Sequence, residues 1–268
     1  MTGADILGTM TSTAERATAL LSLHTDPALL TLVNIWDVAS ARVVARTEGT
    51  RAIATASHSI AAMYGYEDGE HIPRDLMLEA VGRIADAVDL PVTADLEAGY
   101  GDAAETVRRA IGLGVVGCNI EDQLQPVAGA AAVVEAVMRV AVDEGVPDFV
   151  LNARTDAFLE ADGKDPDDVL ADATARGRAF LDAGAPVVFV PGRLSEEQVI
   201  ALVDAFGPLR LTMLPFPGCP PLGRLQELGV ARVSFGPFPQ WVAMTALQDM
   251  VGAVTRGEGP PEGTRALT

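Results

Sequence analysis

The sequence predicts a single-domain α/β protein folded as a (β/α)₈ barrel, the TIM-barrel architecture. From Thr31 onward, short β-branched runs alternate with amphipathic helical stretches, which is typical of repeated βα units around a parallel sheet. The chain has 268 residues, close to the roughly 250 of such barrels, and 49% of them are hydrophobic. No linker or shift in composition divides residues 1–268, so we predict one domain.

Eight short runs rich in β-branched and apolar residues are the predicted strands. They are residues 31–36, 51–57, 91–95, 115–120, 148–153, 186–190, 210–214 and 231–235. Amphipathic helices are predicted between them at residues 74–88, 103–114, 131–145, 166–184 and 195–206. An open, doubly wound sheet would carry a glycine-rich turn after its first strand, but the sequence after Trp36 is DVASARVV, which has no glycine. The closed barrel is therefore favoured.

The charge balance excludes some classes of partner. The chain has 37 acidic and 19 basic side chains and a formal net charge of -18, so it would repel nucleic acids and anionic membrane surfaces. We expect neither as a partner. A site for an anionic metabolite would need a local cation.

Cysteine content and the N-terminus indicate a cytoplasmic protein. Cys118 and Cys219 are too few for a disulfide framework, and Cys118 is expected to be a small core residue. The N-terminal sequence lacks the basic and apolar regions of a signal peptide, and no apolar run reaches the roughly 18 residues that a bilayer requires. Residues 1–10 are predicted to be loose, and His24 and His71 to be solvated.

Three acidic residues end two neighbouring predicted strands: Asp95, Glu97 and Glu121. Catalytic groups of such barrels lie at the carboxyl ends of the strands, and crowded carboxylates need a counter-ion. Mg²⁺ meets this need because it takes one or two carboxylates directly and keeps waters that others hold. The alternative interpretation is a set of solvated loop acids.

Arg154 ends the next strand, inside the apolar run FVLNARTDAFL. A guanidinium there needs an anion, and its planar fork suits the carboxylate of a substrate. The alternative is an internal salt bridge with Asp156 or with one of the cluster acids. Asn119, at the end of the strand that carries Glu121, is also assigned to substrate binding.

Several segments together resemble the phosphoenolpyruvate mutase and isocitrate lyase superfamily in order and spacing. They are NIWDVASARVV, AIATASHSIAAMYGYEDGE, PVTADLEAGYG, CNIEDQ, NARTDAF, FVPG and LGVARVSFG. The resemblance runs from about Asn34 to the end of the barrel. It implies a (β/α)₈ barrel that exchanges its last helix between subunits and assembles as a homodimer or a homotetramer.

The resemblance also implies a set of roles for residues of this chain. Mg²⁺, with Mn²⁺ as the alternative ion, is held by the positions matching Asp95, Glu97 and Glu121, largely through water. A small 2-oxo carboxylate substrate is bound by the metal and by protein side chains, and an acid lies beside the metal and the reacting oxygen. The binding side chains are Trp36, Ser57, His58 and Arg154, and the acid is Asp68. Glu97 replaces what is more often an aspartate, and His58 stands where a small residue is common.

The segment after Glu121 departs from the pattern of isocitrate and methylisocitrate lyases. Those enzymes carry a long loop with a Lys-x-Cys-Gly-His-like motif, whereas this chain reads DQLQPVAGAAAVVEAV, with about ten residues before the predicted helix. Phosphonate-forming mutases use Lys and Asn on the same loop, and those are missing too. No general acid is therefore available from this loop.

The function that remains is a Mg²⁺-dependent C–C lyase acting on a small 2-oxo dicarboxylic acid through a metal-stabilised enolate, with oxaloacetate decarboxylation the simplest case. Reactions that need a base would draw on His58, Tyr100 or Asp68. One alternative is an isomerase resembling phosphoenolpyruvate mutase or a carboxyphosphonate-processing phosphorylmutase. A third hypothesis is a non-catalytic protein that binds a 2-oxo acid.

Overall fold

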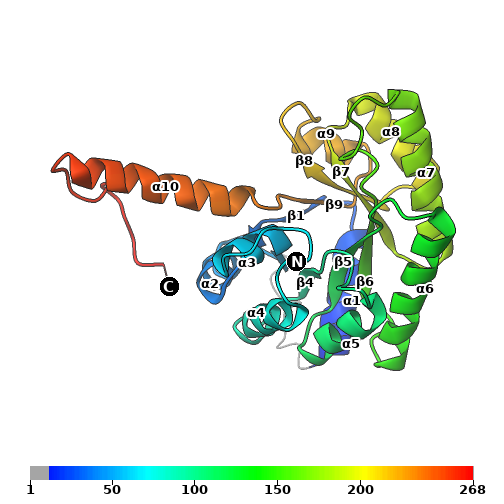
Figure 1. The fold of residues 1–268 in the computed structure, drawn as a ribbon, viewed down its shortest axis with the longest axis horizontal. Coiled ribbons are helices and arrows are strands. Elements are labelled where there is room, and N and C mark those ends of the chain that lie inside the picture. Colours follow the sequence, from blue (N-terminus) through cyan, green and yellow to red (C-terminus); the bar gives the residue numbers. More distant parts are fainter. Residues whose placement is uncertain (1–11, 268) are drawn as a thin grey trace, which may run out of the picture.

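The computed structural model describes residues 12–267, so the predicted loose segment at residues 1–10 lies outside the described residues. Within that range the chain forms a nearly closed barrel of parallel strands surrounded by helices, as predicted (Figure 1). The strands are β1 (Leu30–Leu32), β2 (Asn34–Ile35), β3 (Ile53–Thr55), β4 (Val92–Asp95), β5 (Gly117–Glu121), β6 (Val150–Arg154), β7 (Val187–Gly192), β8 (Leu211–Pro215) and β9 (Arg232–Ser234).

The first predicted strand, residues 31–36, is divided into β1 and β2. β1 pairs with β9, while β2 pairs with β3 on the other side. One stretch of chain therefore pairs with both neighbours across the closing seam of the barrel, which gives nine strand segments from eight predicted strands. Asn34 joins the two sides, because its Nδ2 donates to Thr55 O at 2.8 Å and its Oδ1 accepts from Phe235 N at 2.7 Å.

The five helices predicted by residue range are all present, and their ends differ by a few residues. The described helices are α1 (Thr13–Thr25), α2 (Val38–Ala45), α3 (Ser57–Met63), α4 (Arg74–Asp86), α5 (Ala103–Gly112), α6 (Val127–Asp143), α7 (Pro166–Asp182), α8 (Glu196–Phe206), α9 (Leu222–Glu227) and α10 (Phe238–Thr255). α6 begins four residues earlier than predicted, so the loop after β5 contains only residues 122–126.

α1 packs on the barrel at the level of β5 and β6. A Cβ atom at Gly117 would lie 2.8 Å from Val150 O of β6 and 2.9 Å from Leu20 Cδ2 of α1, so the close approach of the neighbouring strand and of this helix requires glycine there. His24, on the same helix, is fully buried, and the prediction that it is solvated was wrong. Burial, followed by the charge of Arg232, lowers the pKa of His24 to about 3, so the imidazole is neutral.

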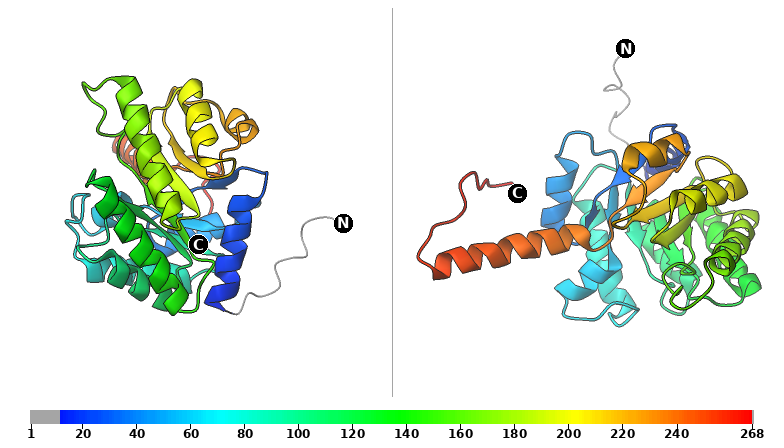
Figure 2. Two further views of the ribbon diagram at one scale, coloured as in Figure 1. Left: turned by 90° about the vertical axis from the view of Figure 1, so that its right-hand side faces the viewer. Right: turned by 90° about the horizontal axis from the view of Figure 1, so that it is seen from above.

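α10 projects away from the barrel, as Figures 1 and 2 both show. Its large apolar side chains are exposed, among them Val242 at 70% and Leu247 at 53% of their surface. Exchange of this helix between subunits stays a prediction. None of the described helices combines the length and apolar character needed to cross a membrane.

Candidate active site

A cavity of about 170 Å³ opens at the carboxyl ends of the strands. It is smaller than the roughly 300–1,000 Å³ of sites for drug-sized ligands, so its size suits a small acid. Of the predicted site residues, six line it together: Ser57, His58, Asp68, Asp95, Asn119 and Arg154. Its remaining wall is mainly apolar and contains Leu159, Phe189, Pro191, Leu214 and Phe216.

Ser57 brings two of the carboxylates together. Its backbone N–H and its hydroxyl both donate to Asp95 Oδ2, at 3.1 and 2.8 Å, and the hydroxyl lies 3.4 Å from Asp68 Oδ1. Burial, and then the negative charge of Asp95, raises the pKa of Asp68. The two acids therefore form a crowded anionic pair at one side of the cavity.

A line of hydrogen bonds across four strands orients Asp95. Thr212 Oγ1 donates to Asn152 Oδ1 at 2.6 Å, and Asn152 Nδ2 donates to Asn119 Oδ1 at 2.7 Å. Asn119 Nδ2 completes the line at 3.4 Å from Asp95 Oδ1. The line follows from the strand register, because Asp95 pairs with Asn119 and Asn119 with Asn152. Asn152 and Thr212 were absent from the predicted site, although the NAR motif contains the first of them.

Arg154 forms two ion pairs in this structure. Its Nη1 lies 2.9 Å from Glu121 Oε2, and its Nε lies 2.6 Å from Asp156 Oδ1. Glu121 and Arg154 are register partners on β5 and β6, which explains the first pair. Burial by itself lowers the pKa of Arg154, but the negative charges of Asp156 and Glu121 have a larger effect in the opposite direction. The pKa of Arg154 is therefore raised overall, and the guanidinium stays charged. Nη2 forms no hydrogen bond within the described part of the chain and remains available to an anion.

Glu97 binds to neighbouring loops and does not line the cavity of Arg154. Tyr100 OH donates to its Oε1 at 2.9 Å, and the backbone N–H of Glu70 donates to its Oε2. Burial raises the pKa of Glu97 to about 7 against these hydrogen bonds. Burial also raises the pKa of Glu121, to about 8, although Arg154 opposes the shift. Both carboxylates thus hold protons more strongly than ordinary glutamates.

The predicted site residues His58, Trp36 and Tyr100 do not lie in one cavity. His58 lines the cavity and packs edge-on against Trp241 of α10, with ring centroids 5.7 Å apart. Trp36 instead lines another cavity, next to Met63 and Tyr64. Tyr100 contacts Glu97 and is outside the cavity of Arg154. Cys118 is fully buried, as predicted, and burial raises the pKa of its thiol.

Two of the carboxylates at the strand ends suit a divalent cation. No cluster of three or more His, Cys, Asp or Glu residues with metal-binding geometry occurs within residues 12–267. Asp95 and Asp68, however, both face the cavity at Ser57, and two carboxylates with water are a sufficient ligand set for Mg²⁺. These two carboxylates are therefore suited to contact the ion directly. Glu97 and Glu121 would reach it only through water or after changing partners.

Comparisons with known proteins agree with this barrel fold. The family model described as phosphoenolpyruvate phosphomutase matches residues 20–255. An uncharacterised protein of Mycobacterium tuberculosis, Rv1998c, is 31% identical over 245 residues, which cover 89% of this chain and 90% of that protein. The oxaloacetate decarboxylase of Paraburkholderia xenovorans is 31% identical over 242 residues, or 85% of this chain and 78% of the enzyme. A crystal structure from Burkholderia cenocepacia J2315, described as a "putative phosphonomutase", is 41% identical with a TM-score of 0.84 and covers 90% of this chain and 99% of its own.

Proposed function

The chain belongs to the phosphoenolpyruvate mutase/isocitrate lyase superfamily of lyases and mutases, and from this we propose that it is a Mg²⁺-dependent lyase of small 2-oxo dicarboxylic acids, with oxaloacetate decarboxylation as the simplest reaction. One observation carries the proposal. A small cavity is lined by Arg154 and by the pair Asp95 and Asp68, next to a loop that supplies no acid.

The loop between β5 and α6 is a tight turn that supports this reaction class. It consists of residues 122–126, DQLQP, which include no Lys, Cys or His. Asp122, its acidic residue, is buried and paired with Arg176 at 3.1 Å. Loss as CO₂ of the carboxylate that lies β to the oxo group of oxaloacetate leaves an enolate and needs no protein nucleophile, so the reaction can proceed without a catalytic group from this loop.

The residues of the chain have distinct tasks in the proposed reaction. Arg154 binds the substrate carboxylate, for which Nη2 is free, and the apolar wall of Leu159, Phe189 and Leu214 limits water. Asp95 and Asp68 would hold Mg²⁺, which supplies positive charge that stabilises negative charge developing on oxygen. As CO₂ leaves, the electrons of the broken C–C bond form the enolate of pyruvate. His58, the cavity residue with a transferable proton that neither holds the metal nor forms an ion pair, then provides the proton to carbon.

The direct test is incubation of the purified protein with oxaloacetate and Mg²⁺. We expect pyruvate to form faster than with Mg²⁺ alone and expect Asp95→Ala to remove the difference. Pyruvate at the metal-only rate would reject the proposal. Binding of oxalate without turnover of any three- to six-carbon 2-oxo acid would indicate instead a protein that only binds such acids.

A phosphonate-forming isomerase is the second candidate, favoured by the description of the Burkholderia cenocepacia structure. The short β5–α6 loop weighs against it, because it lacks the Lys and Asn expected there. Phosphorus NMR after incubation with phosphoenolpyruvate and Mg²⁺ separates the candidates. A product with carbon-bonded phosphorus would favour the isomerase over the lyase.

We also propose a homodimer or homotetramer in which α10 packs on a second subunit. The exposed apolar side chains along this helix support it, because a monomer would leave them in water. They include Trp241, Val242, Met244, Leu247, Val251 and Val254. Light scattering on the eluted protein should give at least twice the monomer mass, and Leu247→Glu should lower it.

A further inference from the structure

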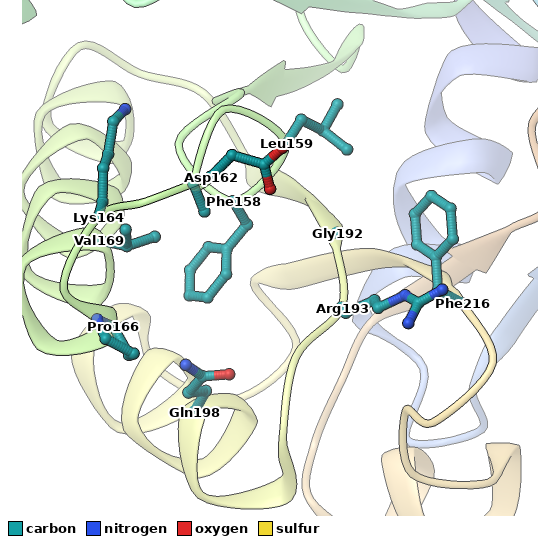
Figure 3. Close-up of a pocket in the computed structure, with 11 residues that line it drawn as sticks. Phe158, Leu159, Asp162, Lys164, Pro166, Val169, Gly192, Arg193, Gln198 and Phe216 are labelled. Carbon is teal, nitrogen blue, oxygen red and sulfur yellow. The ribbon is translucent and has the colours of Figure 1, made fainter.

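A second cavity, of about 440 Å³, lies next to the candidate active site at the same end of the barrel. Its walls come from the segment after β6, the end of β7, α8 and the segment after β8. Leu159 and Phe216 line both cavities, so the two cavities adjoin at these apolar side chains. Figure 3 shows the residues that line the second cavity, Phe158 among them.

Both apolar and polar groups line this second cavity. Phe158, Leu159 and Phe216 provide apolar surface. Arg193 follows β7 and lines the same cavity as Phe216 (Figure 3). Gln198 accepts from Ser195 N through Oε1 at 2.9 Å, which leaves its Nε2 free to donate.

Arg193 is a cation of this cavity that lacks a counter-ion among the residues described. Its side chain makes no hydrogen bond or ion pair with the residues described, whereas Arg154, Arg176 and Arg224 near the same end each have two carboxylate partners. Lys164, the only lysine of the sequence, also lines the cavity and forms no ion pair with the residues described, and the carboxylate of Asp162 lies in the same wall. In a chain of net charge -18, an unpaired arginine beside the substrate cavity provides a specific place for an anion.

We propose, on the basis of the function proposed above, that the substrate is a 2-oxo acid longer than oxaloacetate. Its 2-oxo acid end occupies the cavity of Arg154, its apolar middle packs on Leu159 and Phe216, and its distal carboxylate binds Arg193. A chain that extends from the first cavity of about 170 Å³ past Leu159 and Phe216 into the second explains why the side chains shared by the two cavities are apolar and why an unpaired guanidinium lies beyond them.

The test uses oxamate, an unreactive analogue of a 2-oxo acid, and N-substituted oxamates with tails of increasing length. One series ends in a carboxylate and the matched series ends in a methyl group. Titration calorimetry with Mg²⁺ present should show that a long carboxylate tail improves affinity about tenfold or more over oxamate and over the methyl tail, the usual size of a charge-assisted hydrogen bond.

Arg193→Ala should remove the advantage of the carboxylate tail and leave oxamate affinity unchanged. Arg210→Ala is the matched control, because Arg210 is exposed and has no side-chain partner within residues 12–267 but precedes β8 at the other end of the barrel. Equal affinities for both tails, or an unchanged preference in Arg193→Ala, would overturn this inference while oxamate binding and oxaloacetate turnover still supported the proposed function. Failure of oxamate to bind, together with no oxaloacetate turnover, would overturn both.

Discussion

Ser57 binds Asp95 twice: its backbone N–H and its hydroxyl both donate to Oδ2, at 3.1 and 2.8 Å. The serine begins α3 and the aspartate ends β4, so this pair fixes the start of a helix to the end of a neighbouring strand. Since Asn119 approaches the other oxygen at 3.4 Å, both oxygens of Asp95 have donors from the protein. The carboxylate is oriented before any ligand enters.

Ser57→Ala should therefore impair the site. The change removes one hydrogen bond to a charged group, worth about 1.5–3 kcal/mol, so kcat/KM for a 2-oxo acid should fall about tenfold or more. Ser59→Ala is the matched control on the same helix, because Ser59 Oγ is buried without a partner among the residues described. It should leave kinetics unchanged. Equal losses in both variants would mean that the effect comes from the helix and not from Asp95.

Asp95→Asn should weaken Mg²⁺ binding and activity far more than folding. The amide keeps the shape of the side chain and an oxygen that can accept from Ser57, but it loses the charge that a hard cation requires. We expect at least about a tenfold loss of Mg²⁺ affinity by titration calorimetry. The melting temperature without metal should change little. Unchanged Mg²⁺ affinity would contradict the assignment of Asp95 as a ligand.

Most of the barrel was predictable because each βα unit carries its own local pattern. Seven of the eight predicted strands map onto one strand each, β3 to β9, and only residues 31–36 divide into two. That division depends on β1 and β2 pairing with different neighbours, which no local pattern encodes. The burial of His24 depends similarly on where α1 packs, and its polar-looking sequence context was misleading.

The candidate site was predictable where strand ends place residues together. Asp95, Asn119 and Arg154 follow from the register of β4, β5 and β6. The structure separates Trp36 and Tyr100 from that cavity, because their positions depend on how loops fold over the strand ends. The prediction for Arg154 left open a salt bridge, and the structure shows two, with Glu121 and Asp156. A substrate would be an additional partner at Nη2.

Stability should fall with rising pH in the metal-free protein, and Glu97 should cause part of the fall. Burial raises its pKa from 4.5 to about 7, so the folded state holds the proton more tightly than the unfolded state. This stabilisation is complete below pH 4.5 and is lost as the pH rises through about 7. Between pH 5.5 and 7.5 it amounts to about 1–2 kcal/mol at 1.36 kcal/mol per pKa unit.

Urea unfolding in EDTA at these two pH values measures the loss. Glu97→Gln should lose about 1–2 kcal/mol less than the wild type, because its amide does not titrate. Glu48→Gln changes an exposed carboxylate outside the cluster and corrects for the general repulsion of an acidic chain. This control should lose as much unfolding free energy between the two pH values as the wild type. The same loss in Glu97→Gln would show that Glu97 does not titrate in this range.

Arg154→Lys tests whether the arginine binds substrate in addition to its two internal partners. The planar guanidinium of Arg154 can contact Glu121, Asp156 and a substrate carboxylate at the same time, whereas the ammonium group of a lysine keeps the charge but lacks this geometry. Both stability and activity should therefore decrease. Loss of a bidentate or charge-assisted contact of about 1.5–3 kcal/mol predicts a fall in kcat/KM of tens of fold. A stability effect by itself would not identify a substrate contact.

Arg176→Lys is the control that separates the two roles. Arg176 is also buried between two carboxylates, 3.1 Å from Asp122 and 2.9 Å from Asp172, but it does not line the cavity of Arg154. Both variants should melt at lower temperature, because each loses a paired guanidinium. Only Arg154→Lys should then lose kcat/KM when rates are corrected for the folded fraction. If its corrected kinetics match those of Arg176→Lys, Arg154 is structural, and the carboxylate of the substrate must bind elsewhere in the cavity.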